Sequence, residues 1–236
     1  MANPFNYTLV QTVNPAVSTG TITATPANTK VGSLIIVFVG SSALTDTVST
    51  VTDNAGNTYT KAYSIATGTG GNTECWYATN SKPTTSIVVT FSASVATKSV
   101  FVREYSGMVK STPLDTTITA SGSGTAVSTG ASPTTRAANT LVVSNCSCLG
   151  TSPTLSVGAG FGNFTSQTVL AAASLHAIQD LTASSAATQT GLMTGGGTLP
   201  VWDIGTAVFF IARGEGDTLY NHVAVGDGMS RSEVAN

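Results

Sequence analysis

Two glutamates are the acidic residues whose positions could support catalysis. Glu74 and Glu104 lie on segments that alternate like β-strands, and each has an aromatic residue close by, Trp76 and Tyr105. Glycoside hydrolysis needs two facing carboxylates. The structural alternative is that each glutamate pairs with a nearby base such as Arg103 or lies at the rim of a sheet. We favour the structural alternative and predict that the chain is not an enzyme.

The sequence is poorly equipped for nucleophilic catalysis. A serine nucleophile needs a histidine base, and the only histidines are His176 and His222. The chain also lacks the GlyXSerXGly turn that presents a nucleophilic serine in many hydrolases. We interpret His176 as a half-exposed structural residue on a strand.

Oxygen-bearing side chains gather at one predicted turn. Asp53, Asn54 and Asn57 could offer ligands to a calcium ion, which prefers oxygen. The segment has too few acids for a strong site, and Asp, Asn and Gly are also the residues that turns favour. We therefore interpret residues 53–57 as a turn, and we predict no metal and no cofactor.

The three cysteines favour buried free thiols. Cys146 and Cys148 are two residues apart on a predicted strand, so they face the same side of it. A single Cys-X-Cys pair without nearby histidine is a poor zinc site. An odd number of cysteines leaves at least one unpaired, and a disulfide involving Cys75 remains the alternative.

Several aromatic side chains could instead form a stacking platform for sugars. The candidates are Tyr63, Trp76 and Phe161, with Tyr59 and Tyr77 nearby in the sequence. Aromatic residues of this kind are at least as often core or interface residues. Carbohydrate binding is therefore an alternative function and not the preferred one.

The elements that must position these residues are β-strands. Runs rich in Val, Ile and Thr recur at intervals of roughly 8 to 15 residues with turn signals between them, and no segment sustains a helical period. The apolar run 34–39 predicts a central strand covered on both sides. Residues 51–60 predict a hairpin that turns at 53–57. We expect an all-β, antiparallel, jelly-roll-like β-sandwich.

The domain organisation follows from composition. The 236 residues show no break before the final apolar run, so we predict one domain over residues 1–213 and a tail over 214–236. The tail is either a disordered terminus or an arm that orders against a neighbouring subunit, and we favour the arm. Its candidate assembly contacts are Leu219, Tyr220, Val223, Val225, Met229 and Arg231.

Charge excludes several classes of partner. Only 8% of the residues are charged, the net charge is −2, and the basic residues are scattered. A nucleic-acid surface needs clustered Lys and Arg, so we expect no nucleic-acid partner.

We also expect no membrane partner, because no apolar stretch approaches the length of a membrane span. The start lacks signal-peptide features, which predicts that the protein stays in the cytoplasm or leaves by a route such as host lysis.

Several motifs, in this order, resemble a β-sandwich module of phage virion structural proteins and bacterial surface proteins. They span residues 48–60, 75–78, 87–92, 103–107, 113–115 and 207–213. The segment 226–233 is similar to short linker repeats of phage virion proteins. The Cys-Ser-Cys strand departs from the module. No catalytic residue can be transferred from this resemblance.

The resemblance implies a virion structural protein, either a capsid decoration or a fibre-type protein, that acts through assembly contacts. Its implied partners are the major capsid protein and further copies of itself, since such proteins are usually symmetric oligomers and a trimer is expected. The implied location is the virion. The alternative is a carbohydrate-binding or adhesin module on an extracellular surface, with host glycans as ligands.

Overall fold

The computed structural model describes residues 7–43, 46–65, 71–94, 97–170 and 173–212. Within these ranges the chain forms fourteen strands, which pair antiparallel throughout, and no helix. The described part therefore also contains no helix that could cross a membrane. The prediction of an all-β antiparallel fold is confirmed.

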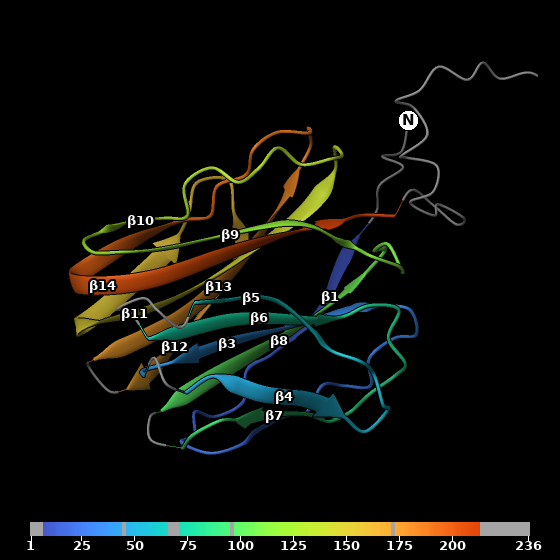
Figure 1. The fold of residues 1–236 in the computed structure, drawn as a ribbon, viewed down its shortest axis with the longest axis horizontal. Helices are drawn as coiled ribbons and strands as arrows, with labels where there is room; N and C mark the ends of the chain where they lie inside the picture. The colour runs from blue at the N-terminus through green and yellow to red at the C-terminus, as the bar shows by residue number, and fades with distance from the viewer. Residues whose placement is uncertain (1–6, 44–45, 66–70, 95–96, 171–172, 213–236) are drawn as a thin grey trace, which may run out of the picture.

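Three sheets are stacked as layers, as Figure 1 shows. The central sheet has the order β1-β8-β3-β6-β5. Its strands are β1 (Thr8–Val13), β8 (Lys98–Ser106), β3 (Leu34–Ser41), β6 (Asn72–Ala78) and β5 (Thr60–Ile65). The small sheet has the order β2-β7-β4 and covers one face of it; its strands are β2 (Ile22–Ala24), β7 (Ile87–Phe91) and β4 (Val48–Asp53).

The outer sheet covers the opposite face of the central sheet and has the order β10-β14-β11-β13-β12, with β9 also paired to β14. Its strands are β9 (Leu114–Gly122), β10 (Ala126–Ser128), β11 (Thr140–Val157), β12 (Gly162–Leu170), β13 (Ser174–Ala183) and β14 (Leu192–Phe210). The predicted β-sandwich is confirmed, and the outer sheet packs on the central sheet as a further layer.

Strand β3 is buried along its whole length, as its unbroken apolar sequence predicts. Ile36 and Phe38 join the apolar cluster between the central and outer sheets. Ile35, Val37 and Val39 join the cluster between the central and small sheets. Alternate residues of one strand thus fill two cores, which explains why the run is continuous rather than alternating.

The first eight strands pair in the nested manner of a jelly roll. Strand β1 pairs with β8, β2 with β7 and β3 with β6. Such nesting arises when a long antiparallel ribbon folds over into two sheets. The jelly-roll-like prediction therefore holds for residues 8–106, and the outer sheet follows it in the chain.

The predicted hairpin over residues 51–60 is wrong. Strand β4 pairs with β7 in the small sheet, whereas β5 pairs with β6 in the central sheet. The segment 53–57 is a corner between two layers and fixes no register between β4 and β5. Turn chemistry alone cannot distinguish these cases, because Asp and Gly suit both, and Gly56 has a φ of 71° here.

The outer sheet covers its own far face by bending. Strands β11 and β14 are 18 and 19 residues long, and their pairing shifts register on either side of Thr151. Beyond this irregularity Leu155 and Met193 return to pack with Cys146 and Trp202. The backbone N–H of Gly158 also donates to Oε1 of Gln179 on β13 at 2.9 Å. One long ribbon thus provides both a sheet and its cover.

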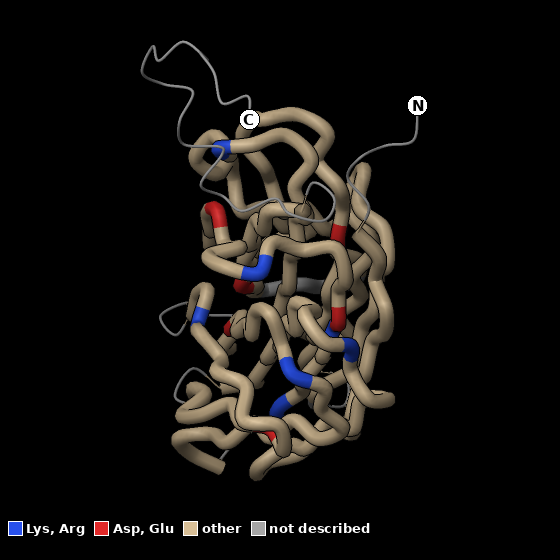
Figure 2. The backbone as a smooth tube through the Cα atoms, turned by 90° about the vertical axis from the view of Figure 1, so that its right-hand side faces the viewer, with Lys and Arg blue, Asp and Glu red and all other residues tan. Residues whose placement is uncertain are grey.

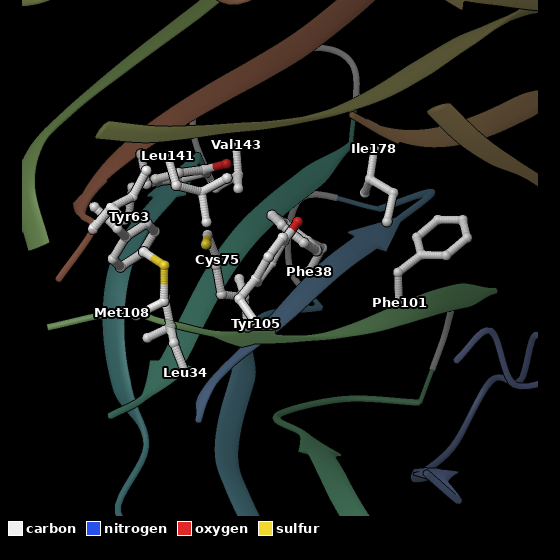
Figure 3. Packing of buried hydrophobic residues seen from close by; sticks show 14 residues of the cluster. Leu34, Phe38, Tyr63, Cys75, Phe101, Tyr105, Met108, Leu141, Val143 and Ile178 are labelled. Atoms are coloured by element: carbon white, nitrogen blue, oxygen red, sulfur yellow. The ribbon is translucent and has the colours of Figure 1, made fainter. Parts of the chain in front are cut away.

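The core between the central and outer sheets is large and mixed in composition. Figure 3 shows Phe38, Phe101 and Tyr105 of the central sheet facing Leu141 and Ile178 of the outer sheet. Aromatic and branched side chains from two facing sheets interdigitate in such a layer. This contact joins the jelly roll to the residues that follow it.

Short connections complete the outer sheet at its edge. The segment after β9 contains the short strand β10. Before β14 begins at Leu192, backbone hydrogen bonds already tie Gln189 and Gly191 to Ser132 and Thr129. The tail over 214–236 lies outside the described residues.

Candidate functional site

The carboxylate of Glu74 is fully engaged by donors inside the jelly roll. Its Oε1 accepts the Val48 N–H at 2.7 Å and Nδ2 of Asn72 at 2.8 Å. Its Oε2 accepts Nε1 of Trp76 at 2.9 Å and lies 2.9 Å from Nζ of Lys61. The side chain is buried at the contact between the central and small sheets. These four partners hold the carboxylate in one orientation.

The carboxylate of Glu104 is engaged in the same way at another place. Its Oε1 accepts the Lys30 N–H at 2.6 Å and the Ser33 hydroxyl at 2.8 Å. Its Oε2 accepts Nε2 of Gln11 at 2.7 Å. The expected partner Arg103 faces the opposite side of the strand and pairs elsewhere. Glu104 therefore holds the loop before β3 against β8.

The two glutamates do not form a catalytic pair. Glu104 is opposite Ile35 on β3, and Glu74 is opposite Val39. Four residues along a strand and two strand spacings separate their Cα atoms by about 16 Å. A glycosidase pair has its carboxyl groups within roughly 10 Å of each other and facing a substrate, whereas both oxygens of each of these carboxylates accept hydrogen bonds inside the fold. This arrangement leaves each glutamate with a structural role.

The corner at 53–57 uses its oxygens internally. Oδ1 of Asp53 accepts the backbone N–H groups of Ala55 and Asn57, both at 3.0 Å. Its Oδ2 accepts Nδ2 of Asn57 at 2.7 Å and the Tyr59 hydroxyl at 3.0 Å. Burial alone would raise the pKa of Asp53, but these hydrogen bonds outweigh it and hold the pKa below its usual value.

The amide oxygens of the same corner also have donors. Oδ1 of Asn54 accepts the Thr84 hydroxyl at 2.5 Å and the Thr85 N–H at 3.2 Å. Oδ1 of Asn57 accepts the Lys82 N–H at 2.7 Å. These bonds tie the corner to the loop before β7, so the oxygens proposed for calcium serve the fold. The described residues contain no group of three or more His, Cys, Asp or Glu placed to hold a metal ion.

His176 is fully buried between the central and outer sheets, so the expectation of a half-exposed residue is wrong. Its Nδ1 lies 2.5 Å from the Ser99 hydroxyl, and its Nε2 lies 3.5 Å from Nδ2 of Asn145. Burial lowers the pKa of His176 to about 3, so the ring is neutral at pH 7. A Cβ at Gly40 would lie 2.6 Å from the imidazole Cγ, so the ring fits only because this residue is glycine.

The amide of Asn145 connects this imidazole to the rest of the layer. Its Oδ1 accepts the Tyr63 hydroxyl, and its Nδ2 donates to the Glu74 carbonyl oxygen at 3.1 Å. Ser99, His176, Asn145 and Tyr63 come from four strands in two sheets. The set resembles a serine–histidine dyad in composition, but all four side chains are buried. It therefore fixes how the two sheets face each other.

The three aromatic residues proposed for sugar binding lie in three separate clusters. Tyr63 is buried between the central and outer sheets. Trp76 is partly buried against the cluster between the central and small sheets, with Nζ of Lys61 4.8 Å from its ring centroid. Phe161 packs against Val142 on the far face of the outer sheet. The structure brings no two of them together, so they do not form one stacking platform.

The cysteines are free thiols, as predicted. Cys75, Cys146 and Cys148 are all buried and unpaired with one another. Burial raises the pKa of Cys148 to about 12 and raises that of Cys75 and Cys146 as well. A protonated, inaccessible thiol is a weak nucleophile and a weak ligand. These residues therefore act as core side chains.

Charges and hydroxyls are distributed in an unusual way over the described residues. Figure 2 shows how few charged positions the described part of the chain carries. Several of them are buried, namely Asp46, Glu74, Lys98, Arg103, Glu104, Asp180 and Asp203. Charged residues are almost never fully buried unless they are paired. The exposed faces of the strands are left largely to Thr and Ser.

Two buried ion pairs were missed by the reasoning from sequence. Nη1 of Arg103 lies 2.9 Å from Oδ2 of Asp180, with both side chains at most 2% exposed. Nζ of Lys98 lies 2.7 Å from Oδ2 of Asp46, with both fully buried. Lys98 and Arg103 stand out in the sequence as basic residues close to the apolar run 100–102 of the same strand, which is the signal that could have indicated buried partners. The partners are distant in sequence and carry no such signal.

The predicted assembly contacts all lie in the tail, outside the described residues. Comparison with models of protein families, with curated proteins and with solved structures finds no significant match for this chain.

Proposed function

We propose that the chain is a phage virion structural protein, a capsid decoration or fibre-type protein that acts through assembly contacts. The observation that carries this proposal is the placement of polar chemistry. The carboxylates, the imidazole and the thiols of the candidate sites are buried and contact other residues of the fold. The outward faces of the strands carry uncharged hydroxyls.

The outward face of the small sheet illustrates this surface. Thr23 of β2 and Thr52 of β4 lie on either side of Val88 of β7, and Thr50 is opposite Thr90. The three threonines on the edge strands are exposed. A face of hydroxyls costs less to desolvate than a charged face when it is covered, which suits a protein that functions within an assembly.

The proposed partners are further copies of the chain, as a trimer, and the major capsid protein. The tail over 214–236 is the proposed arm, because the described strands end before it and its apolar residues could cover a neighbour's surface. Symmetric homo-oligomers are the usual way in which such proteins reach sufficient contact area. Glycan binding is the less favoured function, because its aromatic candidates lie apart.

The test compares the full chain with a version that ends at residue 212. We expect the full chain to form an oligomer by light scattering coupled to size exclusion, and its peptides to be found in purified virions. The shortened chain should keep its β-rich circular dichroism and lose the oligomer. A monomeric full chain that is absent from virions would contradict the proposal, and a glycan array would then test the alternative.

A further inference from the structure

The pair formed by Lys98 and Asp46 differs in chemistry from the other ion pairs of the molecule. Nζ and Oδ2 are 2.7 Å apart and both side chains are fully buried. The Lys98 ammonium also donates to the Thr19 carbonyl oxygen at 2.8 Å and lies 5.1 Å from the centroid of the Phe91 ring. An amine and a carboxyl group are thus held together in a dry, partly aromatic site.

The backbone on both sides of the pair is fixed. The Ser42 N–H donates at 3.1 Å to the carbonyl oxygen of Thr97, which precedes Lys98. Nδ2 of Asn72 donates to the Asp46 carbonyl oxygen at 2.9 Å and to Oε1 of Glu74 at 2.8 Å. Asn72 therefore connects the segment carrying Asp46 to the buried glutamate beside it. Such positioning converts a reaction between two groups into an intramolecular one of very high effective concentration.

We propose that Lys98 and Asp46 condense to an intramolecular amide bond that covalently joins the segment before β4 to the start of β8. A proton first passes from Nζ to the carboxylate, which leaves a neutral amine and a neutral acid. The site is a modification site made by the fold itself, and this inference does not depend on the proposed function.

The bond changes balance without any further reactant. The Nζ lone pair attacks Cγ of Asp46, a C–N bond forms, and the C–OH bond breaks. The hydroxyl leaves with a proton from the nitrogen, so the products are one amide and one water molecule. Nothing is oxidised or reduced, and the water passes to bulk solvent.

Two other ion pairs of the chain serve as internal controls. Arg103 and Asp180 are equally buried, but a guanidinium keeps its proton and cannot act as the amine nucleophile. Lys61 and Glu74 are 2.9 Å apart, but the lysine side chain is 36% exposed and water stabilises its ammonium form. Only the pair of Lys98 and Asp46 combines an amine with complete burial among the ion pairs of the described residues.

Intact mass spectrometry of the unfolded wild-type chain tests the proposal directly. The expected mass is one water below the mass of the sequence, after any processing of the N-terminus has been established. K98R should show the full mass, and K61R should keep the deficit. A full mass for wild-type protein that has been incubated in the folded state would overturn the proposal, whether or not K98R folds.

Trypsin digestion locates the bond. An amide on Lys98 blocks cleavage there, and Lys82 is followed by proline, so the expected product is a branched peptide of residues 31–61 joined to 62–103. Separate peptides 62–98 and 99–103 as the main products would contradict the proposal. The variant D46N tests the leaving group, because an asparagine side chain releases ammonia where an aspartic acid releases water. Its measured mass should therefore be one ammonia below the mass of its sequence. A deficit of one water in D46N would place the bond elsewhere and overturn the assignment.

Discussion

The two faces of the central sheet hold their polar groups in different ways. On the face toward the small sheet, Glu74 and Glu104 collect donors from loops and strands of the same jelly roll. On the face toward the outer sheet, Arg103 and His176 find partners across the layer, on different halves of the chain. The first arrangement completes a unit, and the second joins that unit to another.

This difference indicates where the structure is most sensitive. Arg103 and Tyr105 both contact Oδ2 of Asp180, at 2.9 and 2.6 Å, while Nδ2 of Asn163 donates to Oδ1 at 2.8 Å. Removing one member leaves a buried charge without its counter-ion. Removing a donor to Glu74 or Glu104 leaves a carboxylate that still has other donors. The contact with the outer sheet should therefore respond more strongly to substitution.

The largest effect is expected at the contact with the outer sheet. R103M should lower the free energy of unfolding by about 3–5 kcal/mol, because Asp180 is then buried without its guanidinium. The double variant R103M/D180L removes both charges and should recover most of this loss. Urea unfolding measures both values. Equal losses in the single and double variants would show that the pair does not set the stability of this layer.

A smaller effect is expected on the other face. E104Q should lower the free energy of unfolding by about 2–3 kcal/mol. The hydrogen bonds from the Lys30 N–H, Ser33 and Gln11 lose their charged acceptor, and the new amide N–H₂ group, itself a donor, points at one of these donors. K82Q is the control, since Lys82 is exposed and substitutions at exposed positions usually change stability little. A cost for K82Q that equals that of E104Q in urea unfolding would contradict the assignment.

The dependence of stability on pH should report His176 and the contact it occupies. Its pKa is about 3 in the folded chain and about 6.5 when unfolded, so below pH 6.5 the unfolded state binds a proton that the folded state does not. This contribution to stability is complete above pH 6.5 and is lost as the pH falls toward 3. By linkage, the loss from His176 reaches about 2 kcal/mol at pH 5.

Urea unfolding at several pH values measures this loss. In H176Q the free energy of unfolding should fall less steeply between pH 6.5 and 5 than in the wild type. The control H222Q, with its substitution in the tail, should keep the wild-type dependence on pH. A wild-type slope unchanged in H176Q would contradict a buried neutral imidazole at this contact.

Much of the fold was predictable because its signals are local. The continuous apolar run of β3, the turn residues at 53–57 and the absence of any helical period indicated an antiparallel all-β chain with a doubly covered strand. The free, buried cysteines also followed from their number and spacing. Each of these features depends on neighbouring residues and their periodicity.

The sequence by itself indicated that the chain folds into antiparallel strands and that few side chains capable of catalysis are present. Only the tertiary structure decided that β4 and β5 belong to different sheets, that Glu74 and Glu104 are about 16 Å apart, and that Lys98 meets Asp46. The physical reason is that pairing across layers joins residues far apart in the chain, and the same turn or strand sequence is compatible with several such pairings. Arg103 and Asp180 are buried because the outer sheet closes over the central sheet, whereas Lys98 and Asp46 are buried on the side of the small sheet, next to Phe91 of β7.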